Sequence, residues 1–220
     1  MDFDKLIEYE LEISSRTDTG NNSVRVLQDT AGSTRTGVGS TVWDAGIVVA
    51  KYLDWQVSQG KMDLRGKTVL ELGAGTGLVG ITVSCLQPET TVLLSDKKEL
   101  VPLLEHNITL NEPQGTVSAI CLDWCIPEHR ERITGAPDLI IVSDGIWAKE
   151  LHSHLADTLA RLAGDNTSVL LAYETRNFEK EAQFMALWSN RFRFHDIKPT
   201  DQHPVMQSED IFLFSGSLKN

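Results

Sequence analysis

From residue 41 onward, the hydrophobic pattern switches repeatedly between short apolar runs and longer mixed segments. The short runs are typical of buried strands, and the segments of about a dozen residues with helical spacing are typical of helices. Strands are predicted at 68–72, 91–95, 116–121, 138–143, 168–173, 192–197 and 211–215. Helices are predicted at 43–55, from 78 onward, and at 99–110, 149–163 and 180–189. This alternation predicts a doubly wound, mostly parallel α/β sheet.

The first forty residues follow a different pattern. Helical spacing is confined to the first dozen residues, and two short strands are predicted at 11–14 and 24–27, joined by the turn Gly20-Asn21-Asn22. Residues 31–40 are rich in glycine, serine and threonine, and we expect a loop. We therefore divide the chain into an N-terminal hairpin and loop extension, 1–40, and a single domain, 41–220.

The stretch TVLELGAGTGLVG, residues 68–80, carries the strongest chemical signal. A strand-like run leads directly into Gly73, Gly75 and Gly77, and an apolar helical segment follows. Glycines at this position permit positive φ angles and let a ligand lie against bare backbone. The pattern predicts the strand-to-helix turn of a cofactor-binding α/β domain without naming the cofactor.

Acidic residues lie at or next to the ends of five predicted strands: Glu71, Asp96, Asp123, Asp144 and Glu174. Each one alone has an ordinary explanation, because aspartate is common in turns and at helix N-caps. In a parallel sheet, however, the carboxyl ends of the strands share one edge, where ligands bind. The set therefore predicts an acidic binding site at that edge.

Composition narrows the choice of partners. The 220 residues carry a formal charge of −11, which disfavours a nucleic-acid binder and favours small molecules or basic partners. No apolar run is long enough for a membrane span and no signal-peptide pattern is present, so we expect a soluble, cytoplasmic protein. Cys121, Cys125 and His129 lack a fourth ligand, and no metal is expected.

Charge also bears on the cofactor. Residues 75–80 fit the pattern GxGxxG, and Asp96 is spaced as an acid that binds ribose hydroxyls, so a nicotinamide dinucleotide and an oxidoreductase are one candidate. A diphosphate at this turn would be repelled by Glu71 and the acidic edge. S-adenosylmethionine has a sulfonium and an ammonium group and no phosphate, so the acids favour it.

The motifs ELGAGTGLVG, VWDAGIVVAKYL, LDW and SDGIW together resemble the class I, seven-stranded S-adenosylmethionine-dependent methyltransferases. More narrowly, the chain resembles the small protein-lysine methyltransferases of the family 16 type, which modify chaperones, elongation factors and the valosin-containing protein ATPase. AYETR near residue 174 and QSEDIFLF near residue 210 are most similar to the branch that methylates valosin-containing protein. The resemblance implies a Rossmann-like sheet of seven strands with an antiparallel C-terminal strand.

The resemblance also implies a role for each matching residue in holding S-adenosylmethionine. Trp43 is expected to pack against the cofactor at the entrance, with Gly73, Ala74 and Gly75 beneath its methionyl portion and Glu71 at the floor. Asp96 is expected to bind the ribose hydroxyls, Asp123 and Trp124 to flank the adenine, and Ser143 to make a backbone contact.

Asp144 opens the acid-x-x-tyrosine motif of this family and is expected to orient the acceptor amine. The fourth position of the motif is Trp147, which keeps an aromatic wall and an N–H donor but lacks the phenol oxygen. We predict Asp144 and Trp147 as the catalytic pair, with Tyr173 a candidate to replace the missing hydroxyl.

Three alternatives remain open at this stage: methylation of histidine, arginine or a small molecule, a nicotinamide-dependent oxidoreductase, and a catalytically inactive cofactor-binding module. We expect a monomer that acts on a lysine of a partner protein. The motifs do not specify the partner, the lysine or the number of methyl groups added.

Overall fold

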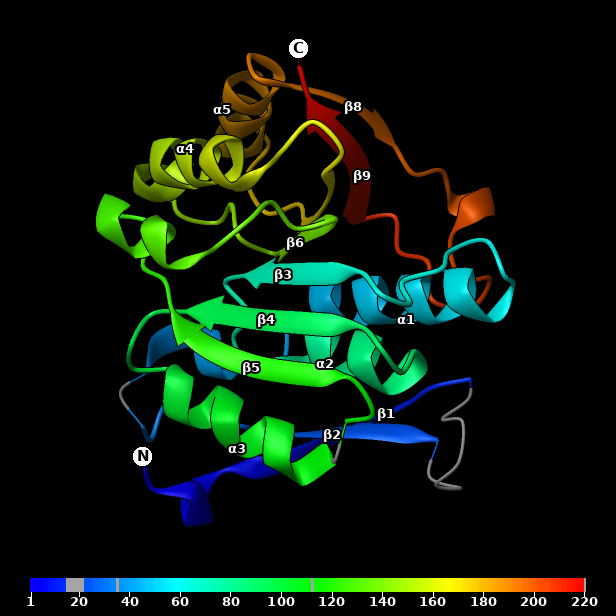
Figure 1. Cartoon of the computed structure of the whole chain (residues 1–220). Coiled ribbons are helices and arrows are strands. Elements are labelled where there is room, and N and C mark those ends of the chain that lie inside the picture. Colours follow the sequence, from blue (N-terminus) through cyan, green and yellow to red (C-terminus); the bar gives the residue numbers. More distant parts are fainter. Residues whose placement is uncertain (15–21, 35, 112, 220) are drawn as a thin grey trace.

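The computed structural model describes residues 1–14, 22–34, 36–111 and 113–219, and its main element is a seven-stranded sheet (Figure 1). The strand order is β5-β4-β3-β6-β7-β9-β8. The bounds are β3 Thr68–Leu72, β4 Thr91–Asp96, β5 Thr116–Cys121, β6 Leu139–Ser143, β7 Ser168–Glu174, β8 Phe192–Asp196 and β9 Ile211–Leu218. All seven strands predicted from the apolar runs are therefore confirmed, with small differences at their ends.

The order of the strands positions the site. β3, β4, β5, β6 and β7 pair in parallel, whereas β9 is antiparallel to both β7 and β8. The predicted antiparallel C-terminal strand is thus confirmed. The chain proceeds from β3 outward to β5 and then returns to form β6 on the other side of β3. This reversal is the switch point at which open α/β sheets bind ligands beyond the carboxyl ends of their strands.

Helices cover both faces of the sheet (Figure 1). They are α1 Asp44–Ser58, α2 Leu78–Leu86, α3 Val101–Asn111, α4 His152–Leu162 and α5 Phe178–Ser189. α1 packs against α2, and α4 packs against α5. One apolar cluster joins α1 and α2 to the sheet, and a second cluster, which includes Phe184 and Trp188 of α5, fills the other side. The predicted helices are confirmed, except that the segment 149–163 begins as a 3₁₀ turn, Lys149–Leu151, before α4.

The N-terminal hairpin is confirmed, but its first strand was predicted too late in the chain. β1 covers Ile7–Glu12 and pairs antiparallel with β2, Ser23–Gln28. The helical spacing of the first dozen residues was therefore misleading beyond the 3₁₀ turn Phe3–Lys5. Buried and exposed side chains alternate with the period of two that is typical of a strand: Leu11 and Ile13 are buried, while the glutamates between and before them face solvent. Gly20 and Asn21 of the predicted turn lie outside the described residues.

The hairpin is attached to the rest of the molecule through β2. Val24 and Val26 are fully buried in the cluster that contains α1 and α2. The side chains of Asn107 and Asn111 in α3 hydrogen-bond to the backbone of β2. Among the described residues, no helix combines the length and the apolar character that crossing a membrane requires.

Candidate active site

One cavity of about 570 Å³ opens at the carboxyl ends of the parallel strands. Its lining includes all the residues that the sequence predicted as a site: Trp43, Glu71, Gly73, Ala74, Gly75, Asp96, Asp123, Trp124, Ser143, Asp144 and Trp147. The structure thus brings together residues that are far apart in the sequence: Trp43 and Trp147 are separated by 104 positions. Their individual roles stay predictions.

The glycine turn after β3 forms a floor of bare backbone. Gly75 has a φ of 57°, and a Cβ atom there would lie 2.7 Å from the carbonyl oxygen of Gly39. Gly73 has a φ of 68°, and a Cβ atom would lie 3.0 Å from the Trp124 ring. A side chain at either position would strain the backbone and collide with a neighbour, so glycine is what lets this turn pack against Gly39 and Trp124.

Glu71, the fourth residue of β3, is 1% exposed. Its Oε2 accepts a hydrogen bond of 2.8 Å from the backbone N–H of Gly80 in α2. Burial raises the pKa of this carboxyl from 4.5 to about 8, and the neighbouring charge of Asp96 adds to the shift. Glu71 is therefore mostly protonated at pH 7, which corrects the charge assigned to it from the sequence. The acidity of the cavity must come from the other carboxylates.

Asp96 closes β4 and lies against the glycine turn. Its Oδ2 accepts the Gly75 N–H at 2.8 Å, and its Oδ1 accepts the Lys97 N–H at 2.7 Å. Burial raises the pKa of the Asp96 carboxyl, while these two hydrogen bonds oppose the rise. Each oxygen keeps further acceptor capacity, which suits a pair of ribose hydroxyls.

Asp123 and Trp124 are held in the loop after β5. The Asp123 N–H donates to His129 Nδ1 at 3.0 Å, and Arg130 donates to the Trp124 carbonyl at 3.0 Å. His129 thus supports this loop. Its Nδ1 lies 4.0 Å from Cys121 Sγ, but the described residues contain no group of three side chains arranged to hold a metal.

Asp144 follows β6 with a φ of 58°, a left-handed conformation that aspartate tolerates better than most residues. Its side chain is 7% exposed and forms a two-bond ion pair with Arg176. Arg176 Nη1 donates to Oδ1 at 2.9 Å and Nη2 donates to Oδ2 at 2.8 Å. Arg176 contacts a predicted catalytic residue, although no role was predicted for it beyond its place in the motif AYETR.

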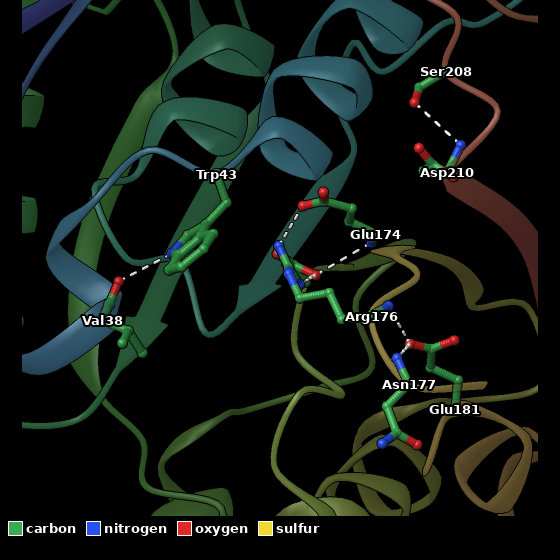
Figure 2. Close-up of polar contacts among 9 residues, drawn as sticks. Val38, Trp43, Glu174, Arg176, Asn177, Glu181, Ser208 and Asp210 are labelled. Carbon is green, nitrogen blue, oxygen red and sulfur yellow. Dashed lines mark hydrogen bonds and ion pairs between the residues drawn. The ribbon is translucent and has the colours of Figure 1, made fainter. Parts of the chain in front are cut away.

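The two tryptophans lie at the rim of the cavity. Trp43, the N-cap residue of α1, donates its indole N–H to the Val38 carbonyl at 2.9 Å (Figure 2). The guanidinium carbon of Arg176 lies 5.1 Å from the centre of the Trp43 ring, within the range of a cation–π contact. Trp147 is 54% exposed and available to a partner.

Tyr173 does not replace the missing tyrosine of the motif. It is buried in the second core cluster, where its ring packs against Phe212 and Phe214, and it is not in the lining of the cavity. Its position in β7 points it into the core because alternate residues of a strand face opposite sides of the sheet. The phenol of Tyr173 therefore does not supply the hydroxyl that the motif lacks at Trp147.

The cavity fits S-adenosylmethionine by its shape and its charge. Gly73 and Gly75 line the cavity and carry no side chain, so a ligand can approach the backbone of the turn closely. Besides the mostly protonated Glu71, the lining has three acidic residues, Asp96, Asp123 and Asp144, and two basic ones, Lys97 and Arg176. An excess of carboxyls suits a cofactor that carries a sulfonium and an ammonium group and disfavours a diphosphate.

Comparison with known proteins agrees with this geometry. The model of the lysine methyltransferase family matches residues 21–191. A zebrafish (Danio rerio) protein N-lysine methyltransferase, METTL21A, is 34% identical over 84% of this chain and 81% of its own. A mouse (Mus musculus) EEF1A lysine methyltransferase 3 is 30% identical over 77% of this chain and 78% of its own.

Solved structures show the same fold at lower identity. The magnesium protoporphyrin IX methyltransferase of Synechocystis PCC 6803, solved with bound S-adenosylhomocysteine, has a TM-score of 0.54 at 15% identity and covers 80% of this chain and 84% of its own. A TehB-like methyltransferase from Corynebacterium glutamicum has a TM-score of 0.56 at 15% identity, over 82% of this chain and 90% of its own.

These matches select the methyltransferase among the alternatives that the motifs left open, and S-adenosylmethionine is the cofactor. The chain belongs to the lysine methyltransferase family: it is an S-adenosylmethionine-dependent protein-lysine methyltransferase.

Proposed function

We propose that this enzyme acts as a cytoplasmic monomer that methylates a lysine of the valosin-containing protein ATPase, an elongation factor or a chaperone. The motifs AYETR and QSEDIFLF resemble those of the enzymes that methylate valosin-containing protein, which supports this ATPase as the acceptor. The name of the mouse relative, an EEF1A lysine methyltransferase, supports the second. The observation that carries the proposal is the position of Asp144 and Trp147 at the rim of the cofactor cavity, with Trp147 open to a partner.

The roles proposed for the residues follow their positions. Gly73, Ala74 and Gly75 form the floor beneath the methionyl portion of the cofactor, and Asp96 accepts the ribose hydroxyls. Glu71 lies at the floor, and Asp123, Trp124, Ser143 and Trp43 complete the walls. When bound, S-adenosylmethionine supplies an electrophilic methyl group on a sulfonium centre.

The protein's remaining task is to place the acceptor amine. An amine attacks in line when its nitrogen lies roughly 3 to 3.5 Å from the methyl carbon. A free lysine has a pKa of about 10.4, so the amine must lose a proton before it attacks. The buried carboxylate of Asp144 can accept an N–H bond from the amine and orient it, while Trp147 provides an apolar wall.

The test combines labelling with two variants. Wild-type enzyme and S-[methyl-³H]adenosylmethionine are incubated with a cell lysate and with the three purified acceptors, and mass spectrometry identifies the labelled residue. Label on histidine, arginine or a small molecule only would contradict a lysine acceptor, and label on some other protein would replace the three named ones.

The variants separate the acceptor site from the cofactor site. Asp144→Asn retains a residue that tolerates positive φ, so it is preferable to alanine. We expect Asp144→Asn to lower the rate of methyl transfer about 100-fold or more, because the acceptor amine is no longer correctly oriented. The affinity for S-adenosylhomocysteine should change little. Asp96→Asn should weaken S-adenosylhomocysteine binding about tenfold, as expected for charged hydrogen bonds. Wild-type transfer by the Asp144 variant would overturn its role.

A further inference from the structure

The guanidinium of Arg176 lies between the walls of the cofactor cavity and contacts three side chains. Beyond its two hydrogen bonds to Asp144, Nη2 forms an ion pair with Glu174, and the guanidinium faces the ring of Trp43. Figure 2 shows Arg176 directed toward Glu174 with Trp43 nearby. Among the described residues, Arg176 forms ion pairs with two acids, Asp144 and Glu174. A single cation is therefore shared by both carboxylates.

A second cavity of about 340 Å³ lies on the other side of this ion pair. It shares Asp144, Trp147 and Arg176 with the cofactor cavity, and its remaining lining is Ile146, Glu174, Asn177, Lys180 and Glu181. The shared residues therefore form the partition between the two spaces. An elongated side chain that enters through the smaller cavity would reach the cofactor cavity at this partition.

The loop that carries Arg176 is firmly held, whereas the side chain is not enclosed. Glu181 accepts hydrogen bonds from the backbone N–H groups of Arg176 and Asn177, both at 2.7 Å. The Thr175 N–H donates to the Asp210 carbonyl at 2.7 Å. The Arg176 side chain, in contrast, is 38% exposed. The part of the partition that can move with least cost is the long arginine side chain.

Asp144 has contacts of its own that do not involve the arginine side chain. The Asp144 N–H donates to the Ala172 carbonyl at 2.8 Å, and the Glu174 N–H donates to Asp144 Oδ1 at 3.3 Å. Two carboxylates that face one cation form a site that a second cation of similar charge can occupy. A lysine ammonium has that charge, and its methylene stem can lie along Trp147.

We propose that Arg176 is a positioning residue that occupies the place of the acceptor ammonium, and that the acceptor lysine enters through the smaller cavity and displaces the guanidinium from Asp144 and Glu174. This proposal rests on the proposed function, because it takes a lysine as the acceptor. It adds the route of the lysine and the group with which the lysine competes.

The test uses two probes that need no knowledge of the acceptor protein. Both are S-adenosylhomocysteine analogues in which nitrogen replaces sulfur. One carries a 2-aminoethyl arm, which places an ammonium where the acceptor amine would lie, and the other carries an ethyl arm. Calorimetry gives the affinity ratio of the two probes within each variant, so any change in binding of the shared cofactor portion cancels.

We expect Arg176→Ala to raise this ratio about tenfold, because charged hydrogen bonds that compete with the ammonium are removed. Arg176→Lys, which keeps a competing cation, should stay near wild type. Lys180→Ala is the matched control, since Lys180 lines the smaller cavity without an ion pair to either acid in the described residues. Its ratio should change less than twofold.

Two results would overturn the proposal. An unchanged ratio in Arg176→Ala would mean that the guanidinium does not compete for the amine position. An equal rise of the ratio in Lys180→Ala would mean that removing any nearby positive charge favours the ammonium probe. Thermal melting of each variant checks that it is folded. If the alanine variant unfolds, Arg176→Gln, which removes the charge and keeps much of the side chain, takes its place with the same expected rise in the ratio. Failure of the acceptor assignment is a separate result, because it is read from the mass spectrometry of the labelled protein.

Discussion

Glu71 illustrates how burial changes the chemistry of a single residue. Its carboxyl has a pKa of about 8 in the folded protein, whereas the ordinary value is 4.5. Between these pH values the folded protein retains a proton that the unfolded chain has lost. The free energy of unfolding therefore falls as pH rises through this window, at most by about 1.4 kcal/mol per pH unit from this group.

We predict that Glu71→Gln removes this pH dependence. Glutamine stays neutral at every pH and can still accept the Gly80 N–H through its amide oxygen. Melting temperatures of wild type and variant without cofactor, measured from pH 5 to pH 8, should diverge, with wild type falling more steeply. Parallel curves would show that the Glu71 carboxyl is charged throughout the range.

For single residues, the sequence predicted most of the site but not which of its side chains form ion pairs with each other. Asp96 and Asp144 could be found because each directly follows an apolar run, which marks the end of a buried strand. Arg176 could not be paired with Asp144 in this way, since the two are 32 positions apart and meet only through the pairing of β6 with β7. The loss of charge at Glu71 depends on burial by neighbouring elements and likewise leaves no local signal.

At the scale of elements, the structure links the hairpin to the glycine turn through one buried side chain. Asn107 of α3 is fully buried, and its Oδ1 accepts the Leu27 N–H of β2 at 2.8 Å. Its Nδ2 donates to the carbonyls of Leu27, at 3.1 Å, and of Thr76, at 2.8 Å. Asn111, one turn later, bonds to the Arg25 backbone in the same way and to the backbone of its own helix.

This arrangement predicts different outcomes for two similar variants. Asn107→Ala leaves several buried backbone groups without a partner, each worth about 1–3 kcal/mol. It should lower the urea-derived free energy of unfolding by about 3 kcal/mol and weaken S-adenosylhomocysteine binding severalfold, because Thr76 belongs to the cofactor turn. Asn111→Ala should destabilise the protein without weakening the cofactor. Equal effects on affinity would show that Asn107 does not support the turn.

The elements themselves were largely predictable, for a physical reason. Strands buried on both faces appear as continuous apolar runs, and glycine and aspartate mark their ends. The position of β9 between β7 and β8 has no such signal and was not predicted; only its antiparallel direction was expected, through the family resemblance. The first strand was misplaced because in the hairpin one face is solvated and the glutamates of β1 interrupt any apolar run.

At the scale of the whole molecule, the net charge of −11 should act on the acceptor more than on the cofactor. A lysine-bearing segment approaches from solvent, where charges interact over a Debye length of about 10 Å at 0.1 M salt and about 3 Å at 1 M. The cofactor, in contrast, is held by groups inside the cavity, such as Asp96, whose hydrogen bonds are partly buried and so less screened.

We therefore predict that the KM for the acceptor identified by labelling rises severalfold between 50 and 300 mM NaCl, because attraction between the acidic enzyme and a basic segment is screened. The Kd of S-adenosylhomocysteine should change less than twofold over the same range, which serves as the control for folding and cofactor binding. Potassium glutamate in place of NaCl separates screening from chloride binding to Arg176. A KM that is independent of salt would show that the acceptor is recognised by shape and apolar contacts at the rim, with Trp147 the first residue to examine.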